Sequence, residues 1–139
     1  MLPLKDKIGT RSKSHSEVVT AERIRAFTSA VGAPDRPEAP PTFLTVFRRG
    51  EFEMLQTLGL ELSNALHADQ QYDFFRPIRA GDEIHFETEV SQVLEKLSTK
   101  QNLQFLTLET RFQVKTPAGP VSVGKSISTL VFRELLESK

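Results

Sequence analysis

The second half of the chain alternates apolar and polar side chains through four successive segments, and this alternation constrains the fold more than any other feature. The segments are residues 66–75, 84–90, 106–114 and 121–132. A period of two is typical of strands that bury one face, because successive side chains point to opposite sides of a sheet. Polar or turn-forming connections separate the segments, so the sequence predicts consecutive strands of a largely antiparallel sheet.

The first and last of these strands have faces that bear on a binding site. One face of the first strand consists of Leu66, Ala68, Tyr72 and Phe74. Its other face carries His67, Asp69 and Asp73. One face of the last strand carries only small residues, namely Ser122, Gly124, Ser126 and Ser128. A face of small side chains allows a helix to lie close to the sheet.

The first half of the chain contains two stretches with helical spacing. The stretch SHSEVV predicts a short first strand, and Thr20 after it is suited to cap a helix, because its side chain accepts a bond from a free backbone N–H. Apolar residues then recur at helical spacing up to Gly32, which suits a helix end. Residues 43–60 return to helical spacing with a broad apolar face typical of a buried helix, which can break or kink at Gly50.

This order of elements predicts an α+β fold. One buried helix and one curved sheet form a single hot-dog domain, in which an antiparallel five-stranded sheet wraps around a central helix. A chain of 139 residues is long enough for one such core. We expect residues 1–14 to form a flexible N-terminal arm and residues 15–139 to form the hot-dog domain.

The composition excludes several classes of function. The 18 basic and 18 acidic residues balance, so no basic surface for nucleic acid is indicated. Cysteine, HExxH and nucleotide-binding glycine motifs are absent, so we expect no metal and no cofactor. No apolar run approaches the ~20 residues of a membrane span, and MLPLKDKIG lacks the apolar core of a signal peptide. We therefore expect a cytoplasmic protein without nucleic-acid or membrane partners.

The run VGAPDRPEAPPTF, residues 31–43, lies between the two helical stretches and contains four prolines and two carboxylates. Each proline disfavours helix in the residue before it, so the run is extended or turned. It is either a linker or part of an active site. The interpretation of the protein's function depends on which of these two roles the run has.

The stretch LHADQQYDFFRPIRAGDEIHFETEV contains a His-Ala-Asp-Gln strand opening at residues 67–70 and an Arg-Pro-Ile-Arg-Ala-Gly-Asp turn at residues 76–82. Both motifs resemble the MaoC-like dehydratases, especially their N-terminal type I fatty-synthase-like dehydratase domain. APPTF, residues 39–43, resembles the segment before the central helix of that family. TAERIRAFTSAVG resembles the helix that runs into its catalytic loop. The resemblance covers residues 17–133.

The resemblance implies a hot-dog fold that hydrates enoyl thioesters or dehydrates 3-hydroxyacyl thioesters in fatty acid metabolism. Catalytic members carry Gly-Asp-x-Asn-Pro-x-His, whose Asp and His hold and activate one water. Gly32 matches the glycine of this motif, but Ala33 stands at the acid and no histidine follows before Pro41. We therefore expect a hydratase/dehydratase-type subunit that is non-catalytic alone or pairs with a catalytic hot-dog chain. A purely structural acyl-binding partner is an alternative.

Four residues are candidates for catalysis. A shifted alignment of the loop places Asp35 in the acid role, still without a histidine. Glu51 falls inside the apolar arc of residues 43–60, where a carboxylate is costly unless it is paired or protonated. It is either the helix-borne acid of a hot-dog acyl thioesterase or an ordinary first-turn residue of a helix. His67 and Asp69 share a strand face at i, i+2, so they either cooperate at a site or form a polar strand surface.

The resemblance also implies a ligand and a partner. The ligand is an acyl-CoA or an acyl-carrier-protein thioester, with Pro41, Thr42 and Phe43 at the entrance of an acyl tunnel. From the residues themselves, a group of arginines is either a site for the phosphate of such a ligand or a set of ordinary surface residues, namely Arg48, Arg49, Arg76 and Arg79. Asp82 follows a glycine turn, where its carboxylate is expected to cap backbone N–H groups. A sheet closed over one helix leaves an apolar seam and an edge strand, so we expect a homodimer or a heterodimer with another hot-dog chain.

Overall fold

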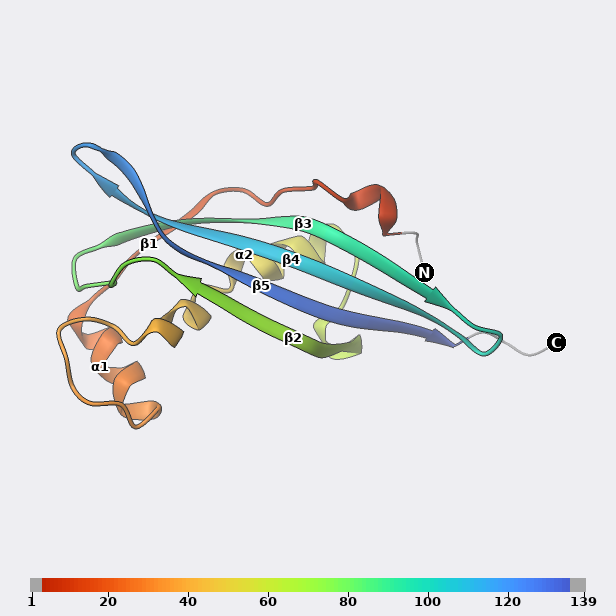
Figure 1. Ribbon diagram of the computed structural model, residues 1–139, viewed down its shortest axis with the longest axis horizontal. Coiled ribbons are helices and arrows are strands. Elements are labelled where there is room, and N and C mark those ends of the chain that lie inside the picture. Colours follow the sequence, from red (N-terminus) through yellow and green to blue (C-terminus); the bar gives the residue numbers. More distant parts are fainter. Residues whose placement is uncertain (1–3, 136–139) are drawn as a thin grey trace.

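The computed structural model describes residues 4–135, which form a five-stranded antiparallel sheet and two α-helices (Figure 1). The elements in chain order are β1 (His15–Val18), α1 (Ala21–Ala30), α2 (Arg49–Thr57), β2 (Ala65–Phe74), β3 (Glu83–Leu97), β4 (Gln101–Thr116) and β5 (Gly119–Leu135). Short 3-10 helices span Lys5–Lys7, Pro41–Val46 and Leu62–Asn64. The strand order is β1-β3-β4-β5-β2, and every neighbouring pair is antiparallel. The predicted α+β class and five-stranded antiparallel sheet are confirmed.

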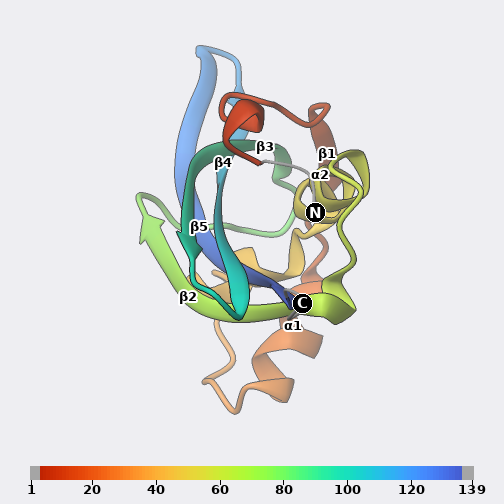
Figure 2. The same cartoon turned by 90° about the vertical axis from the view of Figure 1, so that its right-hand side faces the viewer.

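The sheet curls around α2, which lies on its concave side as the hot-dog prediction requires (Figure 2). One cluster of buried side chains joins Met54 and Leu55 of α2 to leucines and valines of β3, β4 and β5. A second cluster is aromatic and includes Phe47, Phe86 and Phe112, whose ring centroids lie 5.6 to 5.9 Å apart. Burying a side chain of this size contributes about 1.5–3 kcal/mol. Within residues 4–135, no helix is both long enough and apolar enough to cross a membrane.

The ends of α1 follow the sequence prediction. The Thr20 hydroxyl accepts a hydrogen bond from the Arg23 backbone N–H at 3.1 Å, which satisfies one of the free donors of the first turn. After the helix, Gly32 adopts a φ of +69°, a left-handed conformation that favours glycine. The proline run begins there, so α1 cannot continue.

The apolar stretch of residues 43–60 is not one helix, because it breaks at Phe47 and Arg48, just before the predicted break point at Gly50. Gly50 lies in the first turn of α2 and is buried against the sheet. A Cβ at this position would lie 2.4 Å from the Thr88 Oγ1 of β3. Glycine at position 50 therefore allows the start of α2 to lie directly against the sheet.

The described part of the predicted N-terminal arm is docked on β3. The Gly9 backbone N–H donates to the Val90 carbonyl and the Ser12 N–H donates to the Thr88 carbonyl, both at 2.8 Å. β1 covers only the first residues of β3, so the following backbone groups of β3 need other partners, and this segment supplies them. Residues 1–3 of the predicted arm and residues 136–139 of the predicted domain lie outside the described residues.

A β-bulge at Ala68 reverses the predicted alternation along β2. The register against β5 shifts between His67 and Asp69, so Ala68 is an extra residue. One extra residue changes the parity of the strand, and the faces before it are exchanged. Leu66, predicted to share a face with Tyr72, is instead 70% exposed. That part of the predicted face pattern is wrong.

A second bulge, at Val123, removes Ser122 from the predicted face of small residues. The register between β4 and β5 shifts across Phe112–Gln113, and Ser122 is exposed. A Cβ on the glycine that follows Val123 would lie 2.6 Å from the Asp73 carbonyl oxygen and 3.0 Å from the Leu44 side chain. The buried small residues of β5 that admit this close packing are Gly124, Ser126 and Ser128.

Candidate functional site

A cavity of about 450 Å³ opens between α2, the 3-10 helix before it, and strands β2 and β5. Its apolar lining consists of Leu44, Phe47, Leu62, Ala65 and Leu130. Its polar lining consists of Thr45, Arg48, Glu51, His67, Gln70, Tyr72 and Ser126. A concave site with a large apolar wall and a few polar groups is typical of small-molecule binding.

Glu51 is the buried acid of this cavity. It lies in the first turn of α2 and is only 7% exposed. Its Oε1 accepts a hydrogen bond from Ser128 Oγ at 2.9 Å, and its Oε2 accepts one from the Arg48 guanidinium at 3.2 Å. These donors offset the cost of burying a carboxylate. Glu51 is therefore both a first-turn residue and a buried one, so the two sequence alternatives are not exclusive.

A chain of polar contacts continues from Glu51 across the sheet. Ser128 Oγ lies 2.7 Å from the Gln70 Oε1, which lies 3.0 Å from the His67 Nε2. Ser128 of β5 and Gln70 of β2 are direct partners in the sheet, which places their side chains on the same face. The buried acid is thus connected to an exposed histidine through two neutral side chains.

Two further side chains modify the polar wall. Tyr72 lies on β2, where burial raises the pKa of its phenol, the charge of Glu51 raises it further and Arg48 opposes these effects. The phenol therefore stays protonated at neutral pH and remains a hydrogen-bond donor. The Arg48 guanidinium carbon lies 5.2 Å from the centre of the Phe52 ring, which helps hold the arginine beside Glu51.

The described residues offer no arrangement for a metal ion. No group of three or more His, Asp or Glu side chains within residues 4–135 is placed to hold one. In the cavity, the acid and the imidazole are Glu51 and His67, and they are joined by intervening side chains instead of converging on one point. The polar groups of the cavity are placed to hydrogen-bond with one another.

The bulge at Ala68 separates two of the candidate residues. His67 lines the cavity and contacts Gln70. Asp69, on the other side of the bulge, is exposed and lies on the opposite face of β2. The prediction that His67 and Asp69 share a face is therefore wrong, because it assumed an unbroken period of two.

The proline run does not contribute its acid to the cavity. Asp35 is exposed and lies in a separate depression beside Arg36 and Ala80. None of the described residues from 31 to 43 lines the cavity. The structure therefore does not bring Asp35 together with Glu51 or His67.

The residues predicted at a tunnel entrance do not line this cavity. Phe43 is 1% exposed and packs edge-on against two neighbouring phenylalanine rings, so it belongs to the core. Thr42 is exposed, and Pro41 borders a different depression formed by the proline run itself. Arg76 is half-buried and is not part of the cavity lining. The cavity wall begins one residue later, at Leu44.

The prediction that Asp82 caps a turn is confirmed. The Arg79 backbone N–H donates to the Asp82 Oδ2 at 2.9 Å, after a glycine with a φ of +94°. The Arg79 side chain also contacts Glu38 at 3.3 Å, which ties the proline run to the turn before β3. Arg79 is therefore engaged away from the cavity, whereas Arg48 lies in it, so the arginines do not form one phosphate-binding cluster.

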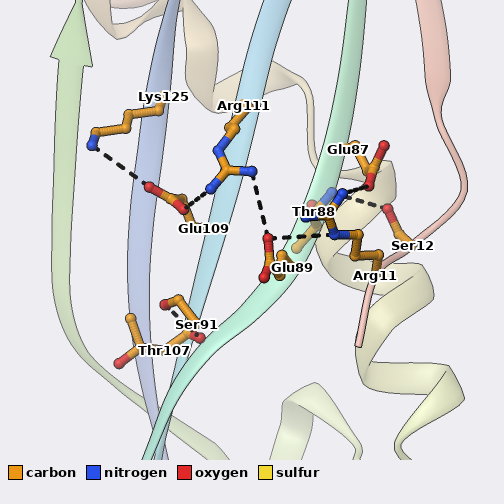
Figure 3. A network of polar contacts seen from close by, with 10 residues as sticks. All are labelled: Arg11, Ser12, Glu87, Thr88, Glu89, Ser91, Thr107, Glu109, Arg111 and Lys125. Carbon is orange, nitrogen blue, oxygen red and sulfur yellow. Dashed lines mark hydrogen bonds and ion pairs between the residues drawn. The ribbon is translucent and has the colours of Figure 1, made fainter. Parts of the chain in front are cut away.

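The outer face of the sheet carries a network of alternating charges (Figure 3). Arg111 contacts Glu89 at 3.5 Å and Glu109 at 2.9 Å. Arg11 extends the network through Glu89 at 3.6 Å, and Lys125 extends it through Glu109 at 3.6 Å. Exposed ion pairs of this kind contribute about 0–1 kcal/mol each. The network matches a solvated sheet face, in contrast to the buried acid inside the cavity.

Sequence reasoning did not identify Arg48, Gln70, Tyr72 and Ser128 as parts of one site. Two signals were present: the small-residue face that includes Ser128, and the His-Ala-Asp-Gln motif that ends in Gln70. Joining them required the register between β2 and β5, which no local pattern gives.

A family model described as "FAS1-like, dehydratase domain region" matches residues 35–116, more than half of the chain. The chain belongs to this family. The resemblance to the MaoC-like dehydratases is therefore confirmed. The match begins within the proline run and includes α2, β2, β3 and β4, so it contains most of the residues of the cavity.

Among curated relatives, a UPF0336 protein of Cutibacterium acnes is 41% identical over 76 residues, 48% of this chain and 54% of that protein. A UPF0336 protein of Thermobifida fusca is 29% identical over 133 residues, 83% of each chain. The chain spans about half the length of the first of these relatives.

Solved structures share the fold at low sequence identity. A chain of the HadBC (3R-hydroxyacyl-ACP dehydratase) complex of Mycobacterium tuberculosis gives a TM-score of 0.67 at 22% identity, covering 91% of this chain and 97% of that chain. A chain of the ChsH1–ChsH2 complex of the same species gives 0.69 at 14% identity, with coverages of 97% and 89%. The MaoC-like dehydratase of Rhodospirillum rubrum gives 0.63 at 21% identity, with coverages of 98% and 100%. These likenesses support the hot-dog fold.

Proposed function

We propose that this chain is the acyl-binding subunit of a hydratase/dehydratase of 3-hydroxyacyl or enoyl thioesters, and that a second hot-dog chain supplies the catalytic Asp and His. The observation that carries the proposal is the separation of the cavity from the proline run. The run lacks the acid and the histidine of catalytic members, and it contributes no side chain to the cavity. The chain keeps a place for the ligand and lacks the usual means of activating water there.

The shape and lining of the cavity support binding of an acyl chain. Leu44, Phe47 and Leu130 are buried and form an apolar wall. Each methylene placed against such a wall contributes about 0.8 kcal/mol. The polar wall opposite is available to the thioester end or to the pantetheine arm of an acyl-CoA or an acyl carrier protein.

The edge of the sheet supports a partner chain. β2 pairs with β5 on one side and lies at the edge of the sheet on the other. Leu66 and Phe75, within and just after β2, are 70% and 59% exposed. Exposed strand edges with apolar side chains favour pairing. Two of the structural neighbours are named as complexes, HadBC and ChsH1–ChsH2. A heterodimer through this edge is the assembly we propose, because a homodimer would only repeat the loop that lacks the Asp and the His.

A spectrophotometric hydration assay tests the proposal. The isolated chain should bind octanoyl-CoA by calorimetry but should not hydrate crotonyl-CoA or octenoyl-CoA. General acid–base help is worth about 10²–10⁴-fold, and its absence should leave no useful turnover. Activity should appear when a hot-dog chain with an intact Asp and His motif is co-purified with it. Robust hydration by the isolated chain would disprove the proposed division of labour.

A second candidate function is hydrolysis of acyl thioesters. The observation that favours it is Glu51, a buried carboxylate that lines the cavity and is held by two donors. Such an acid can direct a water at a thioester carbonyl. Release of free thiol from octanoyl-CoA, abolished in Glu51→Gln with the fold retained, is the expected result. Equal thiol release by wild type and Glu51→Gln would rule out this role for Glu51.

A further inference from the structure

The hydrogen-bonded side chains from Glu51 to His67 cannot all donate and accept freely, because each donor has a limited number of protons. Ser128 Oγ lies 2.9 Å from the Glu51 Oε1 and 2.7 Å from the Gln70 Oε1. A serine hydroxyl has one proton, so it can donate to only one of these oxygens. The oxygen and nitrogen of a glutamine amide exchange places when the amide is turned over, and the surrounding hydrogen bonds decide between the two orientations.

The ionised carboxylate decides the direction. An ionised Glu51 can only accept, so Ser128 donates to it. Gln70 must then turn its amide nitrogen toward Ser128, because an amide oxygen there would face a hydroxyl whose proton is already used. The same end of the amide lies 3.0 Å from the His67 Nε2. An NH₂ group has two protons, so it donates to Nε2 as well, and the neutral ring carries its own proton on Nδ1.

The side chains around the contacts from Glu51 to His67 favour the same direction of hydrogen bonding. Arg48, at the start of α2, contacts the Glu51 carboxylate at 3.2 Å and stabilises its charge. Tyr72 faces Glu51 from β2 as a protonated phenol, which is a donor and not a competing negative charge. Within the described residues, His67 is the remaining ionisable side chain of the cavity lining. Glu51 thus faces two donors, Ser128 and Arg48, and no second carboxylate in the described lining.

We propose that His67 is a ligand-binding residue that donates from Nδ1 to an acceptor oxygen, such as a thioester carbonyl, and that Glu51 fixes this tautomer through Ser128 and Gln70. His67 lines the cavity and is exposed, so a ligand can reach its ring. Within residues 4–135, its ring is hydrogen-bonded at Nε2 and not at Nδ1. Ser128 and Gln70 are positioning residues, because they act through the imidazole. The tautomer follows from the geometry, and only the identity of the ligand rests on the proposed function.

Nitrogen-detected NMR of the imidazoles tests the tautomer directly in the full chain. At about pH 9 an ordinary imidazole is neutral, and the His67 signals are assigned by their loss in His67→Gln. The wild type should show the Nδ1–H tautomer. Gln70→Glu cannot donate to Nε2 and should convert His67 to the Nε2–H tautomer. Ser128→Ala breaks the link to Glu51 and should shift His67 toward the same tautomer.

Asp69→Asn is the matched control, because Asp69 lies two residues away on the opposite face, and it should leave the tautomer unchanged. Gln70 is half-buried on an edge strand, so Gln70→Glu should fold even where Ser128→Ala does not. A wild type with the Nε2–H tautomer would overturn the proposal. A folded Gln70→Glu variant that keeps the Nδ1–H tautomer would overturn it as well.

Titration with octanoyl-CoA tests the ligand role. Binding should move the His67 Nδ1–H resonance, and His67→Gln should weaken binding about three- to tenfold, the effect of one lost hydrogen bond. Binding that leaves this resonance unmoved would overturn the ligand role. If octanoyl-CoA does not bind at all, the ligand role and the proposed acyl-binding function both fail, while the NMR result without ligand still decides the tautomer.

Discussion

The proline run and the start of α2 are neighbours in the sequence, and each carries an acid that the sequence marks as a candidate. Asp35 in the run is exposed and lies apart from the cavity. Glu51 in α2 is 7% exposed, is held by Ser128 and Arg48, and lines the cavity. The motif position of the family points to the first region, whereas the physical chemistry of the structure points to the second.

This difference teaches that burial and hydrogen bonding, not position in the family motif, decide which acid of this protein is placed to take part in binding or catalysis. An exposed carboxylate is surrounded by water, so its exact position in the sequence has little effect on its hydrogen bonds. A carboxylate in a cavity restricts the direction of the hydrogen bonds connected to it, as we propose for the path to His67. Four predictions test the contrast, in order of decreasing expected effect.

The largest effect is expected where the proline run enters the core. Phe43→Ala should cost about 3–5 kcal/mol in the free energy of unfolding, because it removes a buried ring packed between two others. Thr42→Ala, at the exposed neighbouring position, should stay within about 0.5 kcal/mol. Chemical denaturation measures both. Equal effects would mean that Phe43 belongs to the surface of a tunnel, as the sequence suggests, and not to the core.

The next effect concerns the approach of α2 to the sheet. Gly50→Ala should destabilise the protein by about 1–3 kcal/mol, because the new Cβ would lie 2.4 Å from Thr88 Oγ1. The double variant Gly50→Ala with Thr88→Ala removes the obstructing hydroxyl. It should therefore cost less than the sum of the two single variants, by an interaction energy that a double-mutant cycle measures. Simple additivity would show that the two residues are not in contact.

The third prediction compares the two acids themselves. Glu51→Ala should cost about 1–3 kcal/mol, because Ser128 and Arg48 lose a charged acceptor within the cavity. Asp35→Ala should change the stability by less than about 0.5 kcal/mol, since the side chain is exposed. Thermal and urea unfolding of both variants give the comparison. If Asp35→Ala is the more damaging change, the contrast between the two regions is wrong.

The smallest effect comes from the acid on the other side of α2. Glu53 contacts His15 of β1 at 2.5 Å, and mainly this hydrogen bond lowers the pKa of Glu53 below its ordinary value of 4.5. A lowered folded pKa means that the stabilisation is present above pH 4.5 and is lost as the pH falls through the folded pKa. The stability difference between wild type and Glu53→Gln should therefore shrink below pH 4.5. A difference that stays constant from pH 7 to pH 3 would show that the pair does not titrate with folding.

Local sequence patterns predicted much of the fold. Helical spacing located both helical stretches, but residues 43–60 divide into a 3-10 helix and α2. The period of two gave four strands, and Thr20 and Gly32 gave the ends of the first helix. These predictions succeeded because each depends on residues close together in the chain. The absence of an Asp and a His from the proline run is likewise a property of the sequence alone.

Only the tertiary structure decided the faces of the strands around the cavity. A period of two carries a face assignment along a strand only until an extra residue intervenes, and Ala68 and Val123 are such residues. Whether a bulge forms depends on pairing with a strand about 60 residues away for Ala68, which local sequence does not encode. The bulge turned His67 toward Gln70 and away from Asp69, and strand pairing brought Ser128 to Glu51. The sequence thus determined which elements form, and the register between them determined which side chains can act together.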